Sequence, residues 1–154
     1  MPEAIVSETT GVTEVKFYHN APDRLAAAAV ILTKARRQGR KVVVYAPDDA
    51  EARRFDALLW TTPALSFLPH VGQHSKLAAR TPIVFARTLD KLPHADVLMN
   101  LGGDLPGGFS QFAMLVEVVG RSDAERQPAR RRWQSYKEQG YAVTGHDLSN
   151  LGES

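Results

Sequence analysis

The last third of the chain carries a row of cations that includes an indole. Residues 121–132 hold five arginines against two acids, a local charge of +3. A helix over this segment places four side chains on one face, because they are spaced by four, three and four residues: Arg126, Arg130, Trp133 and Lys137. Guanidinium groups match carboxylates, and a tryptophan supplies apolar surface. The pattern favours a groove for a ligand with a carboxylate and an apolar end, although a solvated basic face with Trp133 packed on a sheet has the same spacing.

A second group of residues places large apolar side chains between two prolines. Proline bars a continued helix on both sides of this stretch, and loops of soluble proteins are normally polar and run over the surface. These side chains therefore either fold back into the core or form an exposed surface that binds a partner. The group consists of Trp60, Leu65, Phe67 and Leu68, with Pro63 before the last three and Pro69 after them.

Other motifs do not indicate catalysis. The stretch LGGDLPGGF (101–109) lacks the spacing of a dinucleotide-binding loop and the Lys-Ser/Thr of a P-loop, and is interpreted as a connection before a short helix or strand. His70 and His74 are separated by Gly72, so no helix fixes their spacing for a metal, and they are interpreted as polar loop residues. No serine, histidine and acid stand in a nucleophile context. The sequence predicts no catalytic residue, no metal and no cofactor.

Composition predicts a soluble, cytoplasmic protein. The chain has 154 residues, no cysteine and a net charge of +2. The missing cysteines fit a reducing compartment, and no segment has the pattern of a leader or a membrane span. The small net charge argues against general nucleic-acid binding. We expect residues 1–12 to be a flexible N-terminal extension and residues 13–150 to form one domain.

Short β-rich runs alternate with helix-length segments. Apolar periodicity and end signals such as Asp23, Gly39 and Asp48 or Asp49 define these elements. Strands are predicted over 14–19, 40–47, 82–86, 95–101, 112–120 and 141–146, and helices over 22–39, 48–60 and 123–140. Five or six strands with three long helices predict an α/β three-layer sandwich, with a mainly parallel central sheet and helices on both faces.

Three segments carry a family resemblance. They are FYH near the start, GRKVVVYAPDDAEARRFDALLWTTPALSFLPH in the middle, and FAMLVEVV followed by ARRRWQSYKEQGY near the end. Over Lys16 to Asp147 the chain resembles the chi subunit of bacterial DNA polymerase III holoenzyme. The resemblance implies a Rossmann-like fold and a non-catalytic accessory subunit. Such a subunit links the clamp loader, through the psi subunit, to the acidic C-terminal tail of single-stranded-DNA-binding protein (SSB), which ends in Pro-Phe.

The resemblance also implies site residues. The tail site of the family falls on Arg126, Arg130, Trp133 and Trp60. The contact with psi falls on Phe67, with Leu65, Leu68 and Pro69 beside it. This chain departs from the family in having arginine rather than lysine at position 126. It also has a shorter loop at 120–124, which lacks an apolar residue that lines the family pocket.

Two alternatives remain open. A Rossmann-like sheet can also carry a nucleotide-dependent enzyme, because one α/β scaffold hosts many functions. Within the binding class, the Phe67 surface can serve a chi-associated helicase in place of psi. Specific contact with nucleic acid or with a membrane is not expected.

Overall fold

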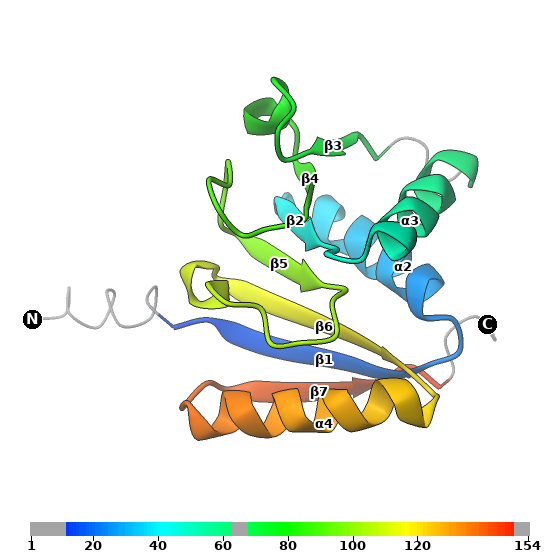
Figure 1. The fold of residues 1–154 in the computed structure, drawn as a ribbon, viewed down its shortest axis with the longest axis vertical. Coiled ribbons are helices and arrows are strands. Elements are labelled where there is room, and N and C mark those ends of the chain that lie inside the picture. Colours follow the sequence, from blue (N-terminus) through cyan, green and yellow to red (C-terminus); the bar gives the residue numbers. More distant parts are fainter. Residues whose placement is uncertain (1–11, 63–67, 150–154) are drawn as a thin grey trace, which may run out of the picture.

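The computed structural model describes residues 12–62 and 68–149, which form one sheet with helices around it (Figure 1). The strands are β1 (Glu14–Ala21), β2 (Val42–Tyr45), β3 (His70–Gly72), β4 (Ile83–Ala86), β5 (Val97–Asn100), β6 (Met114–Gly120) and β7 (Val143–Asp147). The helices are α2 (Arg24–Arg37), α3 (Asp49–Thr61) and α4 (Asp123–Glu138), with short 3-10 turns at Ala78–Arg80 and Phe109–Gln111. The predicted extension, apart from Val12, lies outside the described residues.

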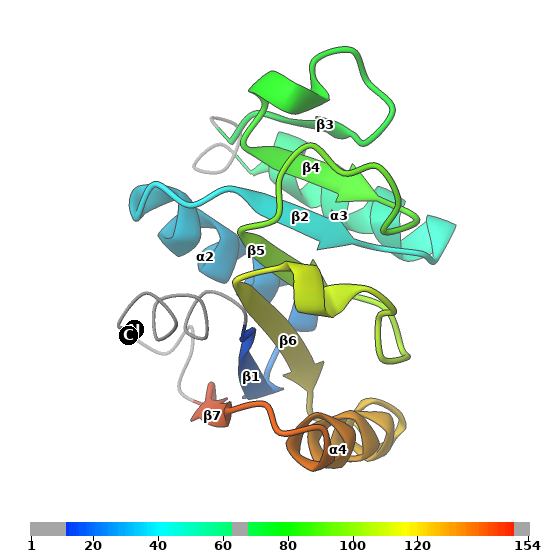
Figure 2. The same ribbon diagram turned by 90° about the vertical axis from the view of Figure 1, so that its left-hand side faces the viewer.

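The seven described strands lie in the order β3-β4-β2-β5-β6-β1-β7, and every strand pair is parallel. Figure 2 shows this succession from β3 at one edge to β7 at the other. The predicted α/β class and parallel sheet are confirmed. The expected five or six strands are fewer than the seven described, and β3 was missed because it has only three residues and no apolar run marks it. His70, expected in a loop, begins this strand.

Two cores cover the two faces of the sheet. One core joins α2 and α3 to Val42, Val44 and the alternate residues of the neighbouring strands. The other joins α4 and Phe109 to Val43 and its own alternate residues. The run Val42–Val44 is fully buried because side chains on both faces are covered. This is the three-layer arrangement that the sequence predicts.

The helices begin where the sequence provides a cap. Asp23 accepts a hydrogen bond from Ala26 N at the start of α2, and Ser122 does the same for Glu125 N at the start of α4. Asp48 precedes α3 as predicted, but its side chain makes no cap hydrogen bond. None of the described helices combines the length and the hydropathy that crossing a membrane requires.

Candidate functional site

A hollow of about 260 Å³ opens between α4 and the ends of β1 and β6. Successive turns of α4 form one wall, and two neighbouring parallel strands form the other. The hollow brings together three of the predicted site residues, Arg126, Arg130 and Trp133. We call it the basic hollow. Its lining consists of Phe17, His19, Val119, Arg126, Ala129, Arg130 and Trp133.

The two arginines of the basic hollow are exposed. Among the ion pairs of the described residues, none involves Arg126 or Arg130. Because they are one helical turn apart, their guanidinium groups lie on the same side of α4. A guanidinium that has no internal partner can take up a carboxylate of a ligand. Lys137, the last cation of the row predicted from the sequence, does not line the hollow.

The inner surface of the basic hollow is apolar. Phe17, Val119 and Ala129 are buried, and the half-buried indole of Trp133 packs on the ring of Phe17 with centroids 5.1 Å apart. Trp133 therefore packs on the sheet and also forms one wall of the hollow. The arrangement offers cations at the rim and a place for an apolar group inside.

A buried ion pair fixes the orientation of α4. Arg132 donates from Nε to Glu117 Oε2 over 3.1 Å, and its Nη2 lies 3.0 Å from Oε1. The Tyr136 hydroxyl and Asn100 Nδ2 donate to the same carboxylate over 2.6 Å and 3.0 Å. Burial, with the negative charge of Glu117, raises the pKa of Tyr136, so this hydroxyl remains a donor. With Arg132 turned into the core, Arg126 and Arg130 face the basic hollow.

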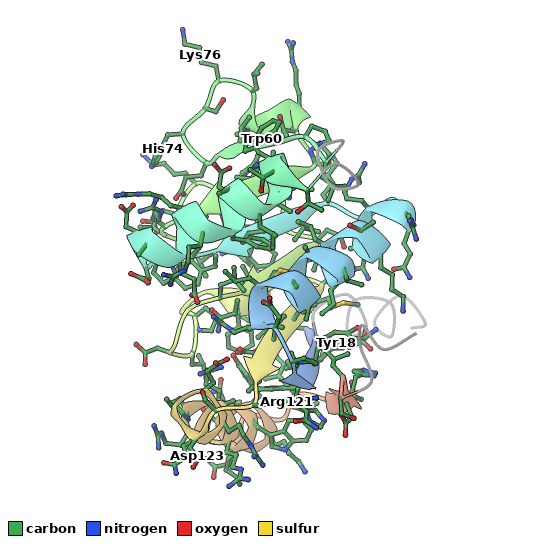
Figure 3. All side chains as sticks on the ribbon, turned by 90° about the vertical axis from the view of Figure 1, so that its right-hand side faces the viewer. Tyr18, Trp60, His74, Lys76, Arg121 and Asp123 are labelled. Atoms are coloured by element: carbon green, nitrogen blue, oxygen red, sulfur yellow. The ribbon has the colours of Figure 1, made fainter. Side chains whose placement is uncertain are left out.

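Trp60 does not lie in the basic hollow. Its indole is 54% exposed at the end of α3 and packs on His70 with ring centroids 4.7 Å apart. Four strands lie between β3 and β1, so five inter-strand spacings of about 4.8 Å set the two sites roughly 24 Å apart. Figure 3 shows Trp60 at the end of the molecule opposite to Arg121 and Asp123, which flank the start of α4. The structure therefore groups Trp60 with Leu68 and Pro69.

His70 ties this second group together. Its Nδ1 lies 2.8 Å from Leu68 O and its Nε2 lies 2.8 Å from Asp56 Oδ1. Leu68 is half-buried against the core and Pro69 is exposed, whereas Leu65 and Phe67 lie outside the described residues. No group of three metal-binding side chains occurs in residues 12–62 and 68–149. We call Trp60, Leu68, Pro69 and His70 the α3 end surface.

The carboxyl ends of the central strands, where α/β enzymes bind nucleotides, border a hollow of about 290 Å³, but Arg24 in its lining is engaged in internal contacts. Arg24 donates to the carbonyls of Val118 and Leu101, each over 2.9 Å, and pairs with Glu51 at 2.5 Å. In the glycine-rich stretch, Gly102 N donates to Asn100 Oδ1 over 2.9 Å. These groups are already satisfied within the chain. The stretch leads into a short 3-10 turn, as predicted.

Sequence reasoning missed four residues that line the basic hollow. Phe17 and His19 come from β1, which is far in the chain from β6 and α4, the consecutive elements that supply Val119 and Ala129. The alternation in β1 was a usable signal, since it places Phe17 and His19 on one face. Val119 supplies apolar lining in a chain whose 120–124 loop is short.

An all-parallel sheet between two helical layers, with a basic hollow beside one helix, defines a Rossmann-like α/β protein. A model of the family described as DNA polymerase III chi subunit, HolC, matches residues 12–144. The chain therefore belongs to the DNA polymerase III chi subunit family, which confirms the resemblance noted in the sequence.

Relatives support this membership. DNA polymerase III subunit chi of Pseudomonas aeruginosa is 31% identical over 144 residues, which cover 91% of this chain and 100% of the relative. The subunit chi of Escherichia coli is 29% identical over 107 residues, with 68% and 72% covered. That of Haemophilus influenzae is 28% identical over 113 residues, with 73% and 78% covered.

Proposed function

We propose that this chain is a cytoplasmic accessory subunit of DNA polymerase III that binds the C-terminal tail of SSB in the basic hollow and psi at the α3 end surface. In this role the chain holds two partners and has no active site of its own. The observation that carries the proposal is the meeting of Arg126, Arg130 and Trp133 around one apolar hollow.

The chemistry of the tail suits this hollow. An acidic segment that ends in Pro-Phe offers side-chain carboxylates, an α-carboxylate and a ring. The guanidinium groups of Arg126 and Arg130 at the rim provide partners for the carboxylates. The ring has an apolar place to enter beside Trp133, and a buried aromatic anchor of this kind supplies much of the affinity in many interfaces.

The α3 end surface suits a hydrophobic partner. Its exposed indole is held by ring packing on His70, which is itself fixed by Asp56 and the Leu68 carbonyl. A rigid, exposed tryptophan beside leucine and proline is typical of an interface anchor. Phe67 and Leu65 belong to this contact in our proposal because of their place in the sequence.

An accessory role without catalysis is supported at the carboxyl edge of the sheet. The cation that a phosphate there would need, Arg24, is held by Glu51 and two carbonyls. A nucleotide would have to displace these contacts, and the charge of Glu51 would repel its phosphates. No observation favours the nucleotide-dependent enzyme as a second candidate.

Reversal of one charge tests the tail site. Arg130→Glu removes a carboxylate partner and adds repulsion, so we expect a loss of about 2–3 kcal/mol, roughly 30- to 150-fold in Kd, for an acidic peptide ending in Pro-Phe. Titration calorimetry measures it. The matched control is Arg131→Glu, an exposed neighbour outside the basic hollow, which should change the Kd by less than about threefold.

Two results would contradict the proposal. One is an Arg130→Glu variant that binds within twofold of the parent. The other is a peptide without its terminal Phe that binds as well as the complete peptide. Since a ligand of the native state raises its Tm, the complete peptide should raise Tm, whereas ATP and NAD should leave it unchanged.

A further inference from the structure

His19 lies in the wall of the basic hollow that faces α4. Side chains alternate along a strand, so Val15, Phe17 and His19 of β1 share the face that α4 covers. Val15 and Phe17 are buried on this face, whereas His19 is exposed. His19 is therefore the residue of this row that a ligand in the basic hollow can reach.

The backbone around His19 is fixed by an irregularity. Asn20 adopts a φ of 63°, and the pairing of β1 with β6 shifts between Tyr18 and Ala21. Asparagine is among the few residues that enter this left-handed region readily. On the other side, the carbonyl of His19 accepts a hydrogen bond from Leu148 N over 2.8 Å. Irregularities of this kind re-aim side chains beside functional sites.

A glycine leaves room in front of the imidazole. Gly145 of β7 pairs with Phe17, and a Cβ at this position would lie 3.4 Å from His19 Nε2 and 3.4 Å from Trp133 Cη2. The imidazole and the edge of the indole therefore face the same small space. A group that enters beside Trp133 comes within reach of His19.

Three charged groups face His19, two cations from α4 and one carboxylate from β7. From α4 it faces Arg126 and Arg130, neither of which has an ion-pair partner among the described residues. From β7 it faces Asp147, which already accepts from Ser149 N over 2.8 Å and from Asn20 Nδ2 over 3.3 Å. Hydrogen bonds, chiefly from Ser149, lower the pKa of Asp147, so this carboxylate stays ionised near neutral pH.

We propose that His19 is a further ligand-contacting residue of the basic hollow, whose imidazole donates a hydrogen bond to a carboxylate of the bound acidic tail. The inference rests on the proposed function and names a contact that the sequence comparison did not supply. Histidine changes charge between about pH 5 and pH 8. A hydrogen bond from a protonated imidazole to a carboxylate is stronger than one from a neutral imidazole, so a lower pH should tighten binding of the tail.

Titration at two pH values tests the contact. The probe is an acidic peptide that ends in Pro-Phe and carries an acetylated N-terminus, so that its amine does not titrate. Its carboxylates, with ordinary pKa values near 4, remain ionised at pH 6 and pH 8. The parent protein should bind about three- to fivefold more tightly at pH 6, as expected for a partly exposed charge pair. His19→Gln should lose this gain.

His146→Gln is the matched control. His146 is also exposed at this edge of the sheet, but it stacks on Tyr18 with ring centroids 4.8 Å apart, on the face away from α4. This variant should keep the gain of the parent protein.

The outcomes separate the two proposals. A parent affinity that is equal at both pH values, or a His19→Gln variant that keeps the gain, would overturn the assignment of His19 and leave the proposed function standing. If the parent protein binds the peptide neither at pH 6 nor at pH 8, the proposed function and this inference are overturned together.

Discussion

At the scale of single residues, neighbouring arginines of α4 have opposite roles. Arg130 and Arg131 are exposed, whereas Arg132 is buried against Glu117, whose side chain is fully covered. Arg132 also donates to Gly103 O over 2.7 Å. A buried pair is itself weak evidence for stability, because desolvation offsets attraction, but loss of one partner leaves an uncompensated charge. The pair therefore acts mainly by fixing which face of α4 points to the basic hollow.

Arg132→Met should destabilise the protein by about 3–5 kcal/mol, because it leaves the carboxylate of Glu117 buried without its cation. Urea unfolding followed by circular dichroism measures the change. Arg131→Met, a substitution of the same type at an exposed position, should stay within about 0.5 kcal/mol of the parent. Equal stability of the two variants would show that the buried pair does not hold α4.

At the scale of elements, an ion pair joins the residues that precede β2 and β5. Arg40 Nη2 lies 2.6 Å from Asp96 Oδ1, and Lys41 N donates to Asp96 Oδ2 over 3.1 Å. The hydrogen bond from Arg40 is the main cause that lowers the pKa of Asp96. Because the folded pKa lies below the unfolded one, this carboxylate contributes stability above its ordinary pKa. The contribution is lost as pH falls through the lowered value.

Asp96→Asn should cost about 0.5–1 kcal/mol at pH 7, as is typical of partly exposed pairs. The difference from the parent should shrink between pH 5 and pH 2, as Asp96 of the parent becomes protonated. Urea unfolding at several pH values measures it. Asp90→Asn, in the same connection between β4 and β5 and exposed, serves as control. A difference that persists undiminished at pH 2 would show that ionisation is not its source.

At the scale of the whole molecule, the basic hollow and the α3 end surface lie near opposite edges of one sheet. Mutations more than about 10 Å apart usually act independently, and roughly 24 Å of sheet separates these sites. Under the proposed function, this separation would let the subunit hold both partners at once without competition between them.

Phe67→Ala and Trp60→Ala should each weaken binding to psi by about 2 kcal/mol or more, since both remove an aromatic anchor. Both variants should bind the acidic peptide within twofold of the parent. Calorimetry with purified psi and with the peptide measures the two effects separately. Equal loss of both activities in a folded Trp60→Ala variant would return Trp60 to the tail site.

The sequence by itself determined most of the helices and strands, and the row of cations on α4 that includes Trp133. Helix caps, the terminal Gly39 and the apolar periods depend on residues within a few positions of each other, so α2, α3 and α4 began within two residues of their predicted starts. Arg126, Arg130 and Trp133 share one face for the same reason, because helical spacing alone brings them together. β3 was not predicted because a strand of three residues is too short to show an alternating pattern.

Only the tertiary structure decided which elements meet. The chain runs first toward β3, with α2 and α3 on one face, and then returns toward β7, with α4 on the other. Right-handed crossovers require this change of face when the direction of travel reverses. The reversal places Trp60 far from Arg126, Arg130 and Trp133 and brings β1 and β6 beside α4, with His19 and Val119. Strand order arises from packing between distant segments, which no local spacing encodes.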